Sequence, residues 1–186
     1  MLTTITVAFY LLLPAYFANM APVWLAKLGW LKFLDKPIDG GRKLGSDYLF
    51  GPNKTWRGLT AGVIVAVIVT AIQAALLSYP ALAAISLLDY RHYFLLFGSL
   101  AGLGALLGDL AKSLIKRRLN IAAGRPWPVF DQLDFVTGFF CFTYWFTPWL
   151  VQPSGSVILT CFLITLLLHP LANIIGYLLG LKKVWW

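Results

Sequence analysis

Long runs of apolar residues alternate with two polar segments along the chain. Uncharged or nearly uncharged runs extend from Met1 to Ala26, from Gly58 to Leu88 and from Phe135 to Leu181. A membrane-spanning helix needs about 20 mainly apolar residues, so the first two runs each predict one span and the third is long enough for two. The turn-forming segment from Gln152 to Ser156 divides the third run.

A further span is predicted from about His92 to Gly108, and it is expected to continue as helix through the polar stretch that follows. Pro14 and Pro22 are expected to bend or interrupt the first span, because proline removes a helical hydrogen bond. The pattern therefore predicts an all-α integral membrane protein with about five transmembrane helices, built as a single domain over residues 1–186.

The distribution of basic residues orients these helices. The two polar segments, at about 27–57 and 109–134, and the C-terminal tail hold 14 of the 15 Lys and Arg residues, which leaves Arg91 alone on the other side. Loops rich in Lys and Arg stay in the cytoplasm. The sequence thus predicts an outside N-terminus, a cytoplasmic C-terminus and two long cytoplasmic loops in a multi-pass protein of the cell membrane.

Composition supports the membrane assignment and narrows the partners. Hydrophobic residues make up 60% of the chain and charged residues only 12%, about half the charged share of a soluble domain. The net charge of +8 suits anionic lipid, phosphate or nucleotide partners, and no nucleic-acid partner is expected. Six of the seven Asp residues also lie in or beside the cytoplasmic segments, so any chemistry is predicted at the inner face.

The second polar segment gathers charged side chains on one helix face. Asp109, Lys112, Ser113 and Lys116 follow at helical spacing and share a face. The alternative is a helix that leaves the membrane with its basic side chains, Arg117 among them, reaching the lipid headgroups. That alternative explains Asp109 poorly, because a carboxylate beside the bilayer is costly unless it is paired or bound to a cation.

Two more carboxylates, Asp131 and Asp134, precede the fourth span, and two interpretations stay open for them. Their spacing resembles a capping box at the start of a helix. Together with Asp109 they also supply three carboxylates at one membrane depth, which suits a hard divalent cation with positions left for substrate phosphates. The metal interpretation is favoured for Asp134 and, less firmly, for Asp131.

The first polar segment looks like a surface that receives phosphate. Glycines around Asp39 and before Asn53 let backbone amides approach an anion, and Lys54 and Arg57 add positive charge at the start of the next helix. A nucleotide P-loop is rejected, because Tyr48 and Asn53 stand where that motif needs glycine. The alternative is a solvated basic connector.

His169 lies inside the last span, one turn before Asn173. A neutral histidine that hydrogen-bonds between helices is the favoured interpretation over a catalytic one.

The two polar segments together resemble the membrane cytidylyltransferases that make CDP-lipids. The run from Gly108 to Arg117 followed by Asp131 and Asp134 is similar to the signature of phosphatidate cytidylyltransferase, and Lys54-Thr55-Trp56 is similar to its Lys-Thr-Trp-x-Gly element. The segment from Arg125 to Phe130 replaces the usual Pro-Gly-His-Gly-Gly. That departure and the short chain resemble the archaeal branch, the CDP-archaeol synthases.

The resemblance implies transfer of CMP from CTP to 2,3-bis-O-geranylgeranylglycerol 1-phosphate, with Mg²⁺ as cofactor. The implied catalytic residues are Asp109, Asp131, Asp134 and Lys116, with the three aspartates as metal ligands. The implied substrate-binding residues are Asp39, Asn53, Lys54, Thr55, Arg57, Lys112, Ser113 and Arg117. Prenyl chains are expected between helices, near Gly98, Gly102 and Gly104.

A second class of function stays open, a small membrane transporter or a binder of an anionic lipid or nucleotide. It would explain the basic inner face and His169 inside a span. It would not need three acidic residues at one depth.

Overall fold

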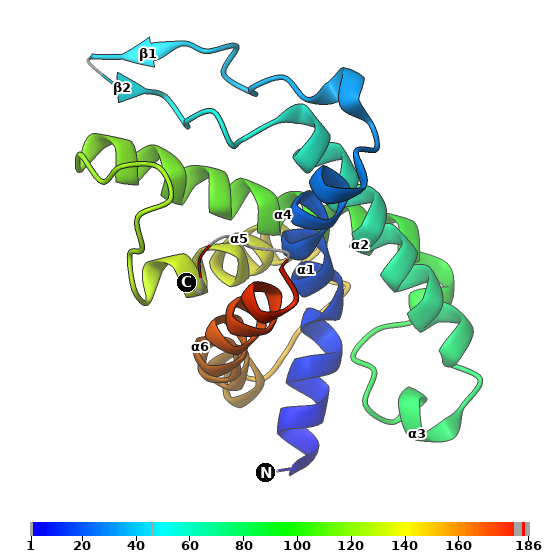
Figure 1. The fold of residues 1–186 in the computed structure, drawn as a ribbon. Helices are drawn as coiled ribbons and strands as arrows, with labels where there is room; N and C mark the ends of the chain where they lie inside the picture. Colours follow the sequence, from blue (N-terminus) through cyan, green and yellow to red (C-terminus); the bar gives the residue numbers. More distant parts are fainter. Residues whose placement is uncertain (1, 46, 181–183, 185–186) are drawn as a thin grey trace.

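The computed structural model describes residues 2–45, 47–180 and 184, and in these residues the chain is mainly helical (Figure 1). The long helices are α1 (Leu2–Leu28), α2 (Trp56–Leu76), α4 (Tyr90–Arg118), α5 (Phe130–Phe146) and α6 (Gly155–Leu178). The short elements are η1 (Lys32–Leu34), the strands β1 (Lys43–Leu44) and β2 (Asp47–Tyr48), and α3 (Pro80–Ala83). The two strands form an antiparallel hairpin that pairs Lys43 with Tyr48 and Leu44 with Asp47.

Four of the long helices in the described part of the chain, α1, α2, α4 and α6, are long and apolar enough to cross a membrane. Helix α5 has 17 residues, at the lower end of the length that spans a bilayer. The protein is therefore a multi-pass membrane protein of the all-α class.

The helices begin and end close to where the hydropathy pattern places them. Helix α4 continues without a break through the polar stretch beyond Gly108, which confirms that prediction. Thr55 caps α2 by accepting a hydrogen bond from the Gly58 amide at 3.2 Å. Helix α1 runs continuously through Pro14 and Pro22, so of the bend or interruption expected there the interruption is wrong, and the bend stays a prediction.

Small residues let α4 approach its neighbours on both sides. A Cβ atom on Gly102 would lie 2.9 Å from the Ala66 Cβ of α2, and one on Gly104 would lie 2.5 Å from the Gly138 carbonyl oxygen of α5. Close backbone approach through small residues is a common way for helices to pack in membranes. The expectation that prenyl chains lie beside Gly98, Gly102 and Gly104 is wrong, because other helices fill that space.

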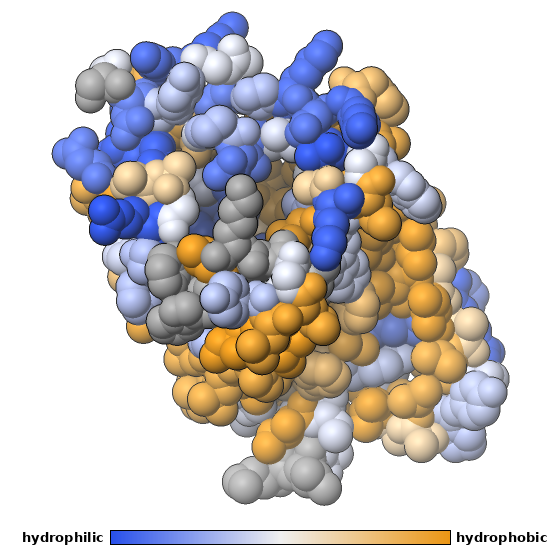
Figure 2. All heavy atoms as spheres, in the orientation of Figure 1, coloured by the Kyte–Doolittle hydropathy of each residue, from blue (hydrophilic) through white to orange (hydrophobic). Residues whose placement is uncertain are grey.

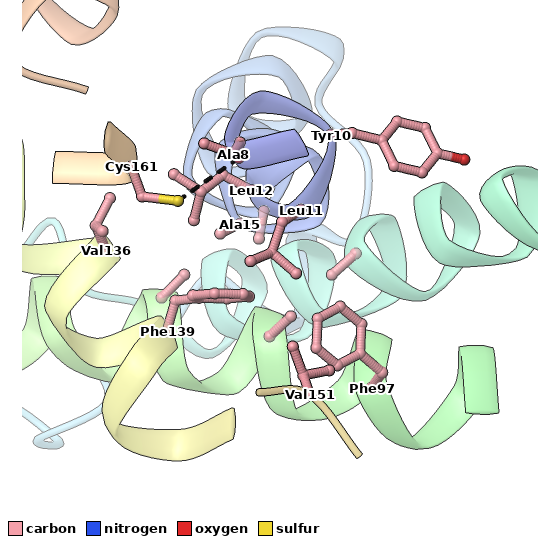
Figure 3. Close-up of a cluster of buried hydrophobic side chains, with 14 of the residues drawn as sticks. Ala8, Tyr10, Leu11, Leu12, Ala15, Phe97, Val136, Phe139, Val151 and Cys161 are labelled. Carbon is pink, nitrogen blue, oxygen red and sulfur yellow. Dashed lines mark hydrogen bonds between the residues drawn. The ribbon is translucent and has the colours of Figure 1, made fainter. Parts of the chain in front are cut away.

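The apolar core lies where α1, α4, α5 and α6 meet (Figure 3). Leu11 and Leu12 of α1 are buried against Phe97 of α4 and Phe139 of α5, and the two rings meet edge to face with centroids 6.0 Å apart. The Sγ atom of Cys161 on α6 donates to the Ala8 carbonyl oxygen of α1 at 3.7 Å.

Polar residues collect at one end of the molecule. The β-hairpin lies beside the C-terminal end of α4, whereas the N-terminus and α3 lie at the opposite end (Figure 1). Hydrophilic side chains gather at the hairpin end, and a hydrophobic surface follows below it (Figure 2). Arg118 donates hydrogen bonds to the carbonyl oxygens of Leu44 and Tyr48, the latter at 3.0 Å, and so ties the hairpin to α4.

Candidate active site

A polar cavity of about 380 Å³ opens at this end of the helix bundle. Its walls come from α1, from the loop before α2, from α4, from the start of α5 and from α6. The two polar segments of the sequence therefore meet in one place, and both contribute side chains to the same cavity.

Lys112 of α4 lies among three carboxylates. Its Nζ atom is 3.0 Å from Asp109 Oδ1, 3.1 Å from Asp131 Oδ1 and 2.7 Å from Asp134 Oδ2. One turn of helix separates Asp109 from Lys112, and the first turns of α5 bring in the other two aspartates. The convergence of Asp109, Asp131 and Asp134 that the sequence predicts is thus present.

Two further lysines complete the charge balance of this cluster. Lys54, from the loop before α2, pairs with Asp109 Oδ2. Lys116 donates to Asp131 Oδ1 at 3.0 Å and to the Arg125 carbonyl oxygen at 2.5 Å. Three lysines and three aspartates therefore neutralise one another inside the cavity, and Arg117 and Arg125 in the lining leave it net positive.

The carboxylates also offer the donor set of a hard divalent cation. In the described part of the chain, no group of three His, Cys, Asp or Glu side chains is arranged as a metal site. The Lys112 ammonium lies in contact with all three carboxylates instead. Carboxylate oxygens are nevertheless the ligands that Mg²⁺ prefers, and a cation that replaced the ammonium would find them already gathered.

The capping interpretation of the two α5 aspartates does not match their positions. Helix α5 begins at Phe130 after Val129, so both aspartates lie inside it. Asp131 accepts a hydrogen bond from the Trp127 amide at 2.5 Å, and Asp134 accepts one from the adjacent Phe135 amide at 2.7 Å. The side chain of Asp134 is only 4% exposed, and its ion-pair partner is Lys112.

The other predicted site residues divide between the cavity and its surroundings. Asn53, Ser113 and Arg117 line the cavity, in addition to the charged residues already described. Ser113 donates to the Asp109 carbonyl oxygen at 2.9 Å. Arg117 is buried, with 7% of its surface exposed, which does not fit the alternative in which it reaches the lipid headgroups.

Asp39, Thr55 and Arg57 lie outside the cavity lining. Asp39 accepts hydrogen bonds from the amides of Gly41 at 2.9 Å and Phe50 at 3.0 Å, and so holds the glycine-containing loop in shape. Arg57 pairs with Asp35 at 3.0 Å, and it lines a neighbouring groove together with Thr55. These contacts give Asp39 and Arg57 structural roles in the loop and at the start of α2. The part of all three residues in substrate binding stays a prediction.

Three polar residues of α1 and α6 line the cavity, although the sequence does not mark them as site residues. They are Asn19, His169 and Asn173. The sequence predicts an interhelical hydrogen-bonding role for His169, and its ring lies 6.0 Å from that of Phe135. The available signal was their position, since a polar residue inside an apolar span marks a functional site by default.

Comparison with known proteins assigns the chain that forms this cavity to a family. The family model described as CarS-like, CDP-archaeol synthase, matches residues 1–186. This chain belongs to the CDP-archaeol synthase family. The resemblance inferred from the two polar segments is thereby confirmed, and it extends over the whole sequence.

Curated CDP-archaeol synthases from several archaea match the chain over nearly its full length. The enzyme of Pyrococcus horikoshii is 42% identical and is aligned over 96% of this chain and 95% of its own. The enzyme of Halobacterium salinarum is 40% identical over 98% and 97%. That of Methanosarcina barkeri is 39% identical over 94% and 100%.

A solved structure has the same fold. It is described as an intramembrane enzyme for archaeal membrane lipid biosynthesis, and it matches with a TM-score of 0.70 and 32% sequence identity. The match covers 90% of this chain and 92% of the other. The helical arrangement around the cavity is thus shared with an enzyme of the membrane.

Proposed function

We propose that this chain transfers CMP from CTP to an isoprenoid ether-lipid phosphate, 2,3-bis-O-geranylgeranylglycerol 1-phosphate, to give CDP-archaeol and pyrophosphate. The observation that carries the proposal is the cavity in which Lys112 joins Asp109, Asp131 and Asp134, in a member of the CDP-archaeol synthase family. The site combines acidic ligands with excess positive charge at one end of a membrane bundle.

The reaction needs positioning and charge neutralisation more than it needs a protein base. The lipid phosphate is largely dianionic at neutral pH, because its second pKa is near 6. One of its oxygens attacks the α-phosphorus of CTP, the bond from the α-phosphorus to the bridging oxygen breaks, and pyrophosphate leaves with that oxygen. No proton has to be removed from the nucleophile.

The basic residues of the cavity suit the nucleotide. Lys54, Lys112 and Lys116, with Arg117 beside them, are placed to offset the charge of the triphosphate and of the departing pyrophosphate. Each of Lys54, Lys112 and Lys116 is paired with at least one aspartate. Binding of CTP therefore exchanges carboxylate partners for phosphate partners, and the lysines stay paired in both states.

Asp109, Asp131 and Asp134 are the residues that would hold Mg²⁺. When bound, the ion supplies neutralisation of phosphate charge and polarisation of phosphoryl oxygens. The aspartates would be its ligands, and Lys112 would then be free to pair with the phosphates of the nucleotide. Asn53 and the backbone of the adjacent loop are proposed to orient the triphosphate from the other wall, and Ser113 to contribute a hydroxyl.

We further propose that α5 is a fifth span and that the cavity faces the cytoplasm, with the N-terminus outside. Arg91 lies at the start of α4, whereas Arg117 and Arg118 lie at its end beside the cavity, in agreement with the preference of basic residues for the inner face. Lys182 and Lys183, assigned to the same face by sequence, lie outside the described residues. The whole chain is proposed to act as one domain.

The deciding experiment is release of pyrophosphate from CTP by purified protein in detergent. We expect release that depends on the lipid phosphate and on a divalent cation, with CDP-lipid formed in equal amount. The alternative, a transporter or binder of an anionic lipid or nucleotide, predicts binding of CTP or lipid with no pyrophosphate. Full activity in excess chelator would remove the metal from the proposal.

A further inference from the structure

A second cavity of about 260 Å³ adjoins the active site between α1 and α6. Its walls are mainly apolar, with Met20 and Trp24 on α1 and Ala172 and Ile175 on α6. The two cavities have Asn19, Val23, His169 and Asn173 in common. The apolar cavity therefore adjoins the active site, and the three shared polar residues, Asn19, His169 and Asn173, form the neck where the two meet.

A larger apolar groove of about 680 Å³ lies on the other side of the bundle, between α4 and α5. In the described part of the chain, the residues that it shares with the active-site lining are Lys112 and Asp134. These two form an ion pair of 2.7 Å. The residues shared with this groove are therefore a charged pair, whereas those shared at α1 and α6 are Val23 and polar side chains that are formally uncharged when His169 is neutral.

Charge is distributed unevenly around the active site. The charged side chains come from the loop before α2, from α4, from Arg125 and from the start of α5, while α1 and α6 contribute neutral side chains. In an in-line displacement the attacking and leaving oxygens lie on opposite sides of the phosphorus. Pyrophosphate carries more negative charge than the lipid phosphate and suits the basic side, which leaves the side of α1 and α6 for the nucleophile.

We propose that the lipid phosphate reaches the active site laterally, between α1 and α6, and that Asn19, His169 and Asn173 hold its glycerol end. The inference rests on the proposed function, and it adds the location of the lipid substrate and the residues that position it. Amide and imidazole groups donate hydrogen bonds to the phosphate and ether oxygens without competing for the charge that the nucleotide needs.

The size of the cavity limits what it holds. The cavity of about 260 Å³ is smaller than the roughly 300–1,000 Å³ of typical small-molecule sites, so it can hold only part of the lipid, which we assign to the glycerol and the start of each chain. The rest of each chain would lie on the lipid-facing surface of α6, where Leu167, Leu171 and Leu178 are exposed. A bulky side chain in this apolar cavity would therefore block the lipid and leave the nucleotide site open.

The test compares two matched alanine-to-tryptophan variants. Ala172→Trp fills the cavity between α1 and α6, and Ala111→Trp fills the groove between α4 and α5. We expect Ala172→Trp to raise the KM for the lipid phosphate by about tenfold or more and to leave the Kd for CTP, measured by calorimetry, unchanged. Ala111→Trp should leave the lipid KM within about twofold of the wild type.

The reverse result, a raised lipid KM in Ala111→Trp with a normal Ala172→Trp, would overturn the inference. If Ala172→Trp does not fold, Asn173→Leu provides the second test, because it removes hydrogen-bonding groups at similar volume. A stable Asn173→Leu variant with the wild-type lipid KM would also overturn it. Failure of the proposed function is seen separately, as a wild-type protein that releases no pyrophosphate.

Discussion

The ammonium of Lys112 lies 2.7 Å from the carboxylate of Asp134, whose side chain is 4% exposed. The same ammonium contacts Asp109 and Asp131, so a single lysine links the acidic groups of α4 and α5. A buried carboxylate without a partner is expensive, so the positive charge of Lys112 stabilises the convergence of the three aspartates.

We expect Lys112→Met to destabilise the protein in chelator and to make its stability depend on Mg²⁺. Removal of one partner from a buried ion pair costs about 3–5 kcal/mol, and a divalent cation would replace the missing positive charge. The measurement is the midpoint of thermal unfolding in detergent across a magnesium series. Lys36→Met, at an exposed lysine, is the matched control. A variant that unfolds like the wild type in chelator would contradict this role for Lys112.

We expect Lys54→Ala to weaken the use of CTP, because the proposed partner of this lysine during turnover is a phosphate group. Loss of a charge-assisted hydrogen bond is worth about 1.5–3 kcal/mol, which corresponds to at least a tenfold rise in the KM for CTP. Lys43→Ala, at an exposed lysine of the hairpin, should keep the wild-type KM. Near-normal CTP kinetics in Lys54→Ala would return this lysine to a structural role with Asp109.

We expect Gly138→Ala to disrupt the packing of α5 on α4. A Cβ atom there would lie 2.8 Å from the Gly108 backbone nitrogen and would also meet the Gly104 carbonyl oxygen. Overpacking typically costs about 1–3 kcal/mol, and here the obstacles are backbone atoms that cannot rotate away. Gly155→Ala, where a Cβ atom meets nothing within 4 Å, is the control. Equal unfolding temperatures for the two variants would show that the helices separate at little cost.

Hydropathy was sufficient to predict the helices, because each long apolar run can satisfy its backbone hydrogen bonds in a membrane only as helix. The helical spacing of Asp109, Lys112 and Lys116 also predicts that α4 continues past Gly108, as it does. The prediction drawn from the glycines of α4 is wrong. Gly102 and Gly104 suggested room for prenyl chains, but the same absence of a side chain lets a neighbouring helix approach. Sequence spacing does not distinguish these two uses.

The sequence predicts most of the charged residues that line the cavity, although it misses Arg125 and includes Asp39 and Arg57, and it does not predict the ion pairs among them. The convergence of Asp131 and Asp134 on Lys112 depends on how α5 crosses α4, which no local pattern encodes. Asn19 and Asn173 belong to helices that are far apart in the chain, and their common position at the cavity follows from the packing of α1 against α6. The sequence marks them as polar residues inside apolar spans, and only the tertiary structure shows that they line the same cavity.

Asp134→Asn tests the acidic cluster most directly, because it removes a charge and keeps the shape of the side chain. The folded state should tolerate it, since Lys112 still contacts Asp109 and Asp131 at 3.0 and 3.1 Å. Turnover should fall by orders of magnitude. A metal ion contributes several kcal/mol to the transition state, and each ~1.4 kcal/mol is a factor of ten in rate.

Asp47→Asn is a matched control for this substitution. Asp47 accepts a hydrogen bond from the amide of the next residue at 3.1 Å, as Asp134 does from Phe135 at 2.7 Å, but it lies on the hairpin outside the cavity lining. The measurements are CTP-dependent product formation and thermal unfolding in detergent, both across a magnesium series. A stable and inactive Asp134→Asn beside an active Asp47→Asn supports a role in binding the cation. A stable, active Asp134→Asn with an unchanged magnesium optimum would remove Asp134 from the site and leave the convergence of the three carboxylates on Lys112 as a purely structural ion-pair cluster.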